Sequence, residues 1–217
     1  MTVQAPPLTG LRKQDGLSAS TDRISMGERL RAVRKKQGLT LSDVAARTGL
    51  AISTISKVER GRMALAYDRF MQLASGLGLD VGELFGDGGQ SFAPGTVCLT
   101  RRGESGLHET ENYVYRMLGA ELRNKRMVPM YGVLKARDRK TFADYVRHPG
   151  EEFLYILAGR VTVEFEGMAP MHLEEEDSLY FDSSRGHIYL TAGDEEARIL
   201  VVCWNPGGPA GDQLPAG

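Results

Sequence analysis

The sequence has little cysteine and no long apolar run, and each shortage excludes a class of protein. Two cysteines in 217 residues, Cys98 and Cys203, exclude a scaffold stapled by many disulfides, and we expect two reduced thiols. No stretch approaches the roughly 20 apolar residues that a membrane span needs, and the amino terminus lacks the apolar core of a signal peptide. We therefore expect a cytoplasmic protein with no membrane partner.

The formal net charge of -1 hides an uneven distribution of charge along the chain. Residues 23–86 carry eleven basic and six acidic side chains, whereas residues 87–217 carry fourteen basic and twenty acidic ones. Only the first of these segments suits a polyanion. The Gly-rich stretch GDGGQSFA lies between them and predicts a flexible linker. We expect a disordered arm (1–22), a first domain (23–86), a linker (87–95), a second domain (96–206) and a flexible tail (207–217).

Residues 38–61, GLTLSDVAARTGLAISTISKVERG, predict two short helices joined by a tight turn. Thr40 suits the N-cap of the first helix, and Gly49 suits the left-handed end that follows it. Ile55 and Val58 lie three residues apart and face one core, while the rest of the second helix is polar. Flanking helices are expected over residues 27–37, 67–75 and 80–85.

This pattern resembles the helix-turn-helix of the lambda-repressor and Cro type, also called the XRE family, over residues 26–85. The resemblance implies an all-α domain that binds double-stranded DNA and regulates transcription. It also implies that Glu59, a carboxylate within the second helix, has Arg34 as its partner. The expected DNA-contacting residues are Arg34 and Lys35 in the basic first helix, Thr40 and Leu41 beside the phosphates, and Ala51, Ile52, Ser53, Thr54, Lys57 and Arg60 along the second helix.

Three of these positions depart from the family pattern. Many relatives carry glutamine where this chain has Leu41 and Ile52, and a polar cap where it has Ala51. An isoleucine cannot make the two-pronged hydrogen bond to adenine, but it can pack on a thymine methyl group. Lys57 then remains the best candidate for a guanine contact. The sequence thus predicts DNA binding more firmly than any base preference.

Beyond the linker the hydrophobic period changes from helical to two. Short runs rich in Val, Leu, Ile, Tyr and Phe alternate with Gly, Pro and charged turns, which predicts an antiparallel sandwich or barrel. The predicted strands cover residues 96–101, 113–118, 128–136, 153–157, 161–165, 178–181, 188–191 and 198–204.

Two stretches in this region, RHPGEEFLYILAGRVTVEFEG at 147–167 and EEEDSLYFDSSRGH at 174–187, resemble the two signature motifs of cupins. The resemblance implies an all-β jelly-roll barrel. Enzymatic cupins hold a divalent metal with two histidines, a glutamate and a third histidine, and these positions fall here on Val146, His148, Glu152 and His187. The first ligand is therefore missing.

Two interpretations of this pocket remain open. His148, Glu152 and His187 could form a facial triad for iron. We favour a metal-free pocket, with no cofactor, in which these three residues and Tyr189 bind a small-molecule effector.

The function hypotheses follow the same division. The first is a regulator whose cupin domain binds an effector or dimerises, and it has no catalytic residue. The alternative is a metal-dependent cupin enzyme, a dioxygenase or isomerase, fused to a DNA-binding domain. We expect a homodimer in the first case, because one helix-turn-helix reads only a few base pairs.

Overall fold

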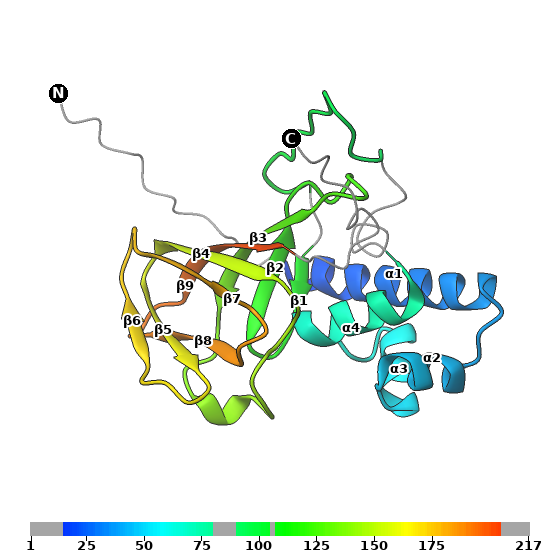
Figure 1. The fold of residues 1–217 in the computed structure, drawn as a ribbon, viewed down its shortest axis with the longest axis horizontal. Helices are drawn as coiled ribbons and strands as arrows, with labels where there is room; N and C mark the ends of the chain where they lie inside the picture. Colours follow the sequence, from blue (N-terminus) through cyan, green and yellow to red (C-terminus); the bar gives the residue numbers. More distant parts are fainter. Residues whose placement is uncertain (1–14, 80–89, 105–106, 205–217) are drawn as a thin grey trace, which may run out of the picture.

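The computed structural model describes residues 15–79, 90–104 and 107–204, and it arranges them as a helical part followed by a part made of strands (Figure 1). This order confirms the expected fold class, an all-α segment followed by an all-β one. The predicted helix at 80–85, the tail at 207–217 and the first fourteen residues lie outside the described residues. Within the described ranges, no helix is both long and apolar enough to cross a membrane.

The described helices have the caps that the sequence predicts. They are α1 (Asp15–Lys36), α2 (Leu41–Thr48), α3 (Ile52–Glu59) and α4 (Tyr67–Leu77). The Thr40 hydroxyl accepts a hydrogen bond from the Asp43 amide at 3.1 Å, and the Asp43 carboxylate accepts one from the Thr40 amide at 2.8 Å. This reciprocal pair is a capping box. Gly49 ends α2 with a φ of 68°, the left-handed conformation that glycine adopts without strain.

Helix α1 begins at Asp15, well before the predicted start at residue 27. It therefore includes residues 15–22, which the sequence analysis assigned to a disordered arm. Both prolines of the predicted arm, Pro6 and Pro7, come before the helix, and the residues after Gly16 contain no helix breaker until Gly27. An acidic residue at the first position also suits the positive end of a helix dipole.

The helices pack closely around one apolar core. Its most buried members are at most 2% exposed and include Leu30, Val44, Ile55 and Phe70. Gly27 allows α1 to lie directly against α3, because a Cβ atom there would be only 2.3 Å from the carbonyl oxygen of Val58. The position of α3 on the molecule is thus fixed by a backbone contact as well as by side chains.

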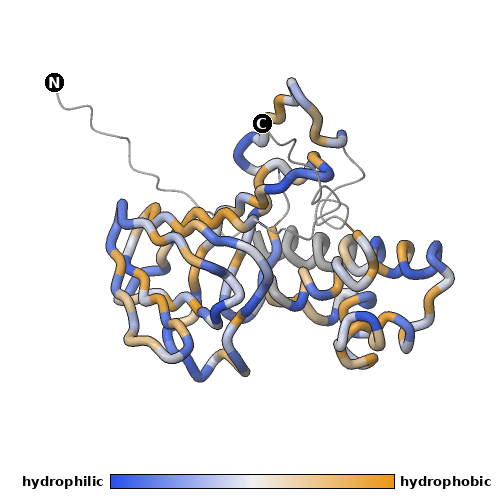
Figure 2. Tube along the Cα trace, viewed as in Figure 1, coloured by the Kyte–Doolittle hydropathy of each residue, from blue (hydrophilic) through white to orange (hydrophobic). Residues whose placement is uncertain are grey.

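The strands form two antiparallel sheets. A six-stranded sheet has the order β1-β2-β3-β9-β4-β7, and a three-stranded sheet has the order β6-β5-β8. The strand bounds are β1 Leu107–Glu109, β2 Tyr113–Met117, β3 Met127–Leu134, β4 Glu151–Ala158, β5 Arg160–Phe165, β6 Met171–Leu173, β7 Ser178–Asp182, β8 His187–Ala192 and β9 Ala197–Trp204. Apolar and polar positions alternate along many of them (Figure 2), and in β9 every second residue is buried.

Seven of the eight predicted strands are confirmed, but the strand predicted at 96–101 is wrong. That segment forms no strand ladder with another described segment, and Val97 and Leu99 are 90% and 68% exposed. Its alternating pattern therefore reflects no buried face. The sequence analysis also missed β1 and β6, which are three residues long and too short to show a period of two.

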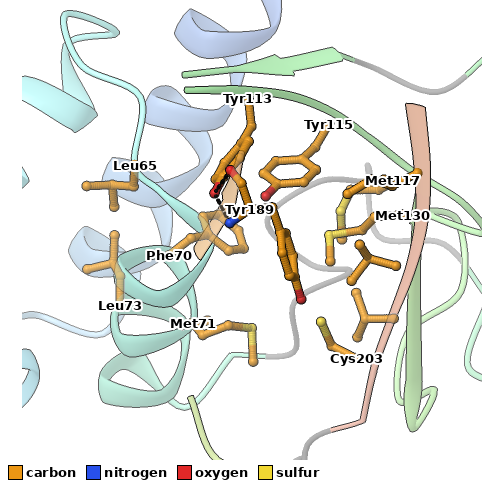
Figure 3. Close-up of a cluster of buried hydrophobic side chains, with 14 of the residues drawn as sticks. Leu65, Phe70, Met71, Leu73, Tyr113, Tyr115, Met117, Met130, Tyr189 and Cys203 are labelled. Atoms are coloured by element: carbon orange, nitrogen blue, oxygen red, sulfur yellow. Dashed lines mark hydrogen bonds between the residues drawn. The ribbon is translucent and has the colours of Figure 1, made fainter. Parts of the chain in front are cut away.

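The helical part and the sheets share one continuous core. Leu65 and Phe70 of the helical part lie near Tyr113 and Tyr189 of the sheets (Figure 3), and all four belong to the same buried cluster. The Nε2 atom of His108 on β1 lies 2.6 Å from the carbonyl oxygen of Leu65, within hydrogen-bond distance. The two parts are thus packed together by apolar contacts and by a buried polar one.

Candidate functional site

The outward face of α3 is accessible, as a DNA-contacting face must be. Ile55 and Val58 are buried against the core, whereas Ser53 and Lys57 on the opposite face are exposed and Ile52 is 49% exposed. Among the other residues expected at DNA, Lys35, Thr40, Ala51 and Arg60 are exposed, and Leu41 and Thr54 are half-buried. The expected contact set therefore lies largely on the surface of the helical part.

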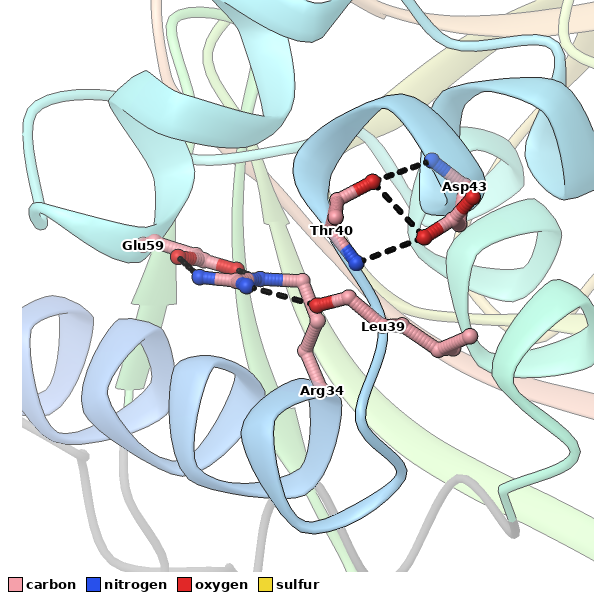
Figure 4. Close-up of polar contacts among 5 residues, drawn as sticks. All are labelled: Arg34, Leu39, Thr40, Asp43 and Glu59. Atoms are coloured by element: carbon pink, nitrogen blue, oxygen red, sulfur yellow. Dashed lines mark hydrogen bonds and ion pairs between the residues drawn. The ribbon is translucent and has the colours of Figure 1, made fainter.

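Thr40 has a structural task in addition to any contact with DNA. Its hydroxyl donates to the Asp43 carboxylate at 2.7 Å and accepts from the Asp43 amide (Figure 4). Both hydrogen-bonding functions of the hydroxyl are used within the cap. Leu41 packs against the apolar core with part of its side chain. The roles of these two residues at DNA stay predictions.

The structure corrects the expected role of Arg34. Its guanidinium forms two hydrogen bonds to the Glu59 carboxylate, at 2.5 and 2.8 Å, and a third to the Leu39 carbonyl at 2.9 Å (Figure 4). The Arg34 and Glu59 side chains are only 12% and 6% exposed. Arg34 is therefore not a phosphate contact, because it is turned inward and joins α1 to α3. The expectation that Arg34 is the partner of Glu59 is confirmed.

The second candidate site is a small buried cavity in the cupin-like part. The structure brings together the four residues expected there: His148, Glu152 on β4, and His187 and Tyr189 on β8. The Nε2 atoms of His148 and His187 lie 2.9 and 3.5 Å from Glu152 Oε2, and the Tyr189 hydroxyl donates to Glu152 Oε1. Glu152 is thus surrounded by two imidazoles and a phenol.

The charge of Glu152 is set by these neighbours. Burial alone would raise the pKa of this carboxyl, but the hydrogen bonds from His148 and His187 outweigh burial and hold the pKa of Glu152 well below its usual range. Burial and the nearby Glu152 charge raise the pKa of Tyr189, which stays a neutral donor. The centre of the cavity is therefore a buried carboxylate.

The tautomer of His187 suits a cation at this place. Its Nδ1 atom lies 2.8 Å from the Arg185 carbonyl oxygen, which can only accept, so Nδ1 carries the proton. Nε2 therefore donates to the Glu152 carboxylate only when it carries a second proton, and in the neutral ring it offers its lone pair to a metal ion instead. A backbone partner for the second nitrogen is usual in metal-binding histidines.

Among the cavity residues that sequence analysis missed are Cys203 and Tyr67. Cys203 on β9 is directly opposite Glu152 in the β4–β9 ladder, and both point to the inside. The alternation of β9 could have placed the thiol inward, but only the strand register could place it beside Glu152. Tyr67 comes from α4, so no pattern in the strands could have indicated it.

The donor set fits a transition-metal ion. One ligand atom from each of His148, Glu152 and Cys203 lies within 4.8 Å of the others, and His187 Nε2 lies 3.5 Å from the carboxylate oxygen that His148 also contacts. Imidazole, carboxylate and thiol groups would hold an ion of the Zn²⁺ or Fe²⁺ class, which would act as a Lewis acid when bound. At the position of the missing ligand, Val146 lines the cavity and exchanges backbone hydrogen bonds with His187 at 3.0 Å.

Known proteins share both parts of this chain. A helix-turn-helix family model matches residues 30–84, and a cupin-domain model matches residues 140–203. The HTH-type transcriptional regulator PuuR of Escherichia coli (strain K12) is 22% identical over 185 residues, which are 83% of this chain and 95% of that protein. The HTH-type transcriptional regulator DdrOP3 of Deinococcus deserti is 31% identical over 110 residues, which are 48% of this chain and 85% of that protein.

A solved structure supports the same fold. The HTH_3 family transcriptional regulator from Vibrio cholerae is 18% identical and superposes with a TM-score of 0.58, over 87% of this chain and 99% of that one. The helix-turn-helix, its exposed outer face and the cupin barrel are thus found together in one chain, and the two named relatives are regulators. The chain belongs to the XRE-type helix-turn-helix transcriptional regulators and carries a C-terminal cupin domain.

Proposed function

We propose that the chain, acting in the cytoplasm as a homodimer, reads double-stranded DNA with the outward face of α3 and responds to a ligand in its cupin cavity. The proposal that α3 reads DNA rests on the difference between its buried face and its exposed face. Ile55 and Val58 hold the helix in the core, and Ile52, Ser53 and Lys57 point away from it. This division leaves a row of side chains free to meet base edges.

The proposed contacts fall into two groups. Ala51, Ile52, Ser53 and Lys57 are positioned for bases at the start and outer face of α3. Lys35, at the end of α1, and Arg60, directly after α3, are exposed cations suited to phosphates. Thr40, Leu41 and Thr54 complete the set. Arg34 is left out, because its charge is already paired.

Replacing Lys57 by alanine should weaken binding to a selected DNA site far more than binding to random duplex. Loss of a good base contact costs about 1–3 kcal/mol, which is about 5- to 150-fold in Kd. The site would come from in vitro selection on random duplexes, and Kd would be measured by fluorescence anisotropy. Lys35→Ala should instead weaken both kinds of DNA and lower the salt slope by about one.

Two controls sharpen this experiment. Lys140→Ala removes an exposed lysine of the cupin part and should change neither affinity nor slope. Arg34→Lys keeps the charge but loses the two-pronged pair with Glu59. This variant should therefore lower the thermal stability and leave the salt slope of DNA binding unchanged. Equal losses on selected and random DNA for Lys57→Ala would contradict its assignment to a base.

The dimer is the next part of the proposal. One α3 reads only a few base pairs, and two copies about one helical turn apart multiply affinity. We expect a mass of two chains in light scattering at micromolar concentration, and a selected site with two inverted halves about 10 base pairs apart. A single-chain mass together with a single half-site would contradict it.

The cavity supports a ligand-binding role but restricts what enters. Its volume is about 20 Å³, enough for one water molecule or ion and too small for an organic effector. An organic effector, as first expected, would have to move part of the wall. The donor set instead favours a divalent metal ion.

The enzyme alternative rests on the same donors. His148, Glu152 and His187 are brought together as a facial set would be. The regulator names of the relatives support the first hypothesis. Metal content by plasma mass spectrometry, followed by turnover assays with added Fe²⁺ or Mn²⁺, separates the two. Turnover that His148→Ala abolishes would establish the enzyme.

A further inference from the structure

Tyr67 lies where the helix-turn-helix meets the cupin cavity. It is the first residue of α4, yet the edge of its ring contacts His148, with 5.1 Å between the ring centroids and 80° between their planes. Tyr67 and the preceding Ala66 line the cavity together with residues of the barrel. The DNA-binding domain therefore provides part of the cavity wall.

The hydroxyl group of Tyr67 is buried and has no hydrogen-bond partner among the residues that the structure describes. The phenol lines the same cavity as the Cys203 thiol and the Glu152 carboxylate. A buried hydroxyl without a partner is unfavourable, and such atoms are rare in folded proteins. This one therefore marks a position where a bound species could complete the hydrogen bonding.

The size and the donors of the cavity indicate which species that is. A volume of about 20 Å³ admits a single ion or water molecule. Imidazole, carboxylate and thiol donors come from His148, Glu152 and Cys203. Nitrogen and sulfur ligands favour Zn²⁺, Fe²⁺ or Co²⁺ and are unsuited to Mg²⁺ and Ca²⁺. The thiolate is the ligand form of cysteine, so binding would release the Cys203 proton to solvent.

We propose that a divalent transition-metal ion in this cavity controls how firmly α4 is packed on the barrel, through the hydroxyl group of Tyr67. The inference rests on the ligand-binding function proposed above. An ion that engages this hydroxyl binds best when α4 is docked, and by linkage it holds α4 docked. Because α4 packs against α2, which packs against α3, the effect reaches the DNA-contacting helix.

Metal binding is tested first, with Co²⁺ as the probe. One equivalent of Co²⁺ added to the full chain should produce the near-ultraviolet absorption of a cobalt–thiolate bond. Cys203→Ser should remove this band. Cys98→Ser is the matched control, because Cys98 is exposed and lies outside the cavity, and the band should remain.

Coupling is tested next by hydrogen exchange without DNA. In the wild type, Co²⁺ should slow amide exchange in α4 by about fivefold or more, the lower end of ordinary allosteric coupling. Tyr67→Phe removes a hydroxyl that has no partner, so the variant should fold and still bind Co²⁺ but lose this protection. Tyr155→Phe, on the opposite face of β4 from Glu152, should keep both.

The possible outcomes distinguish three claims: metal binding, coupling through Tyr67 and regulation of DNA binding. A wild type that binds no Co²⁺ at one equivalent overturns the metal site. Equal protection of α4 in the wild type and in Tyr67→Phe overturns the role of Tyr67. If α4 is protected as expected but Co²⁺ leaves affinity for selected DNA unchanged, the coupling stands and the proposed regulatory function fails.

Discussion

Replacing Glu59 by alanine is expected to lower the free energy of unfolding by about 3–5 kcal/mol. The substitution leaves the Arg34 guanidinium nearly buried, with only the Leu39 carbonyl among its present partners. A charge withdrawn from water without its counter-charge is strongly unfavourable. In the wild type, the hydrogen bonds that Arg34 donates to Glu59 raise the pKa of Arg34. In the variant the arginine still cannot lose its charge, because a guanidinium stays protonated in proteins.

Urea unfolding followed by circular dichroism would measure this loss, and a more exposed ion pair provides the control. Lys135 Nζ lies 3.0 Å from Glu109 Oε1, and the two side chains are 27% and 37% exposed. Glu109→Ala should cost less than about 1 kcal/mol, because such pairs are screened by water. If Glu59→Ala costs no more than Glu109→Ala, the Arg34 pair does not hold α1 to α3.

The helix-turn-helix was predictable because its signals are local. Thr40 and Gly49 mark the ends of α2 through hydrogen bonds and backbone angles that involve only neighbouring residues. The error at Arg34 has a different origin. Arg34 and Lys35 of α1 were both assigned to DNA, but successive helical residues point about 100° apart. Lys35 is exposed, whereas Arg34 turns inward.

The cavity was predictable only in part. The cupin motifs placed His148, Glu152 and His187, and the period of two then placed Tyr189 on the same face as His187. Cys203 is more than fifty residues from Glu152, and its place follows from the pairing of β4 with β9. That register depends on the whole sheet, so no local pattern contains it.

Nothing in the sequence indicated that Tyr67 lies at the cavity, because its position depends on how the two domains dock. Its helix shows an ordinary apolar pattern that predicts burial without naming the partner. The packing of Leu65 and Phe70 near His108 sets the docking and brings Tyr67 over the cavity. A long-range contact of this kind follows from the packing of complete domains.

Replacing Glu152 by alanine should also lower the free energy of unfolding by about 3–5 kcal/mol, and it should abolish binding of Co²⁺. The carboxylate is 3% exposed and is the shared partner of His148, His187 and the Tyr189 hydroxyl. Its removal leaves these groups buried without an acceptor. Each group has then lost its hydration without gaining a hydrogen bond in return, which lowers the stability. Thermal unfolding and isothermal titration with Co²⁺ would measure the two effects.

Two neighbouring variants separate charge from shape at this position. Glu152→Gln keeps a carbonyl oxygen for Tyr189 but removes the charge, so it should lose Co²⁺ binding while losing less stability than Glu152→Ala. Glu151→Ala removes an exposed carboxylate that points to the other side of β4, and its effect should stay within about 0.5 kcal/mol. If Glu152→Gln bound Co²⁺ as the wild type does, the carboxylate would be a structural partner of the two histidines, and the cavity would have to hold its ligand through the imidazoles and the thiol alone.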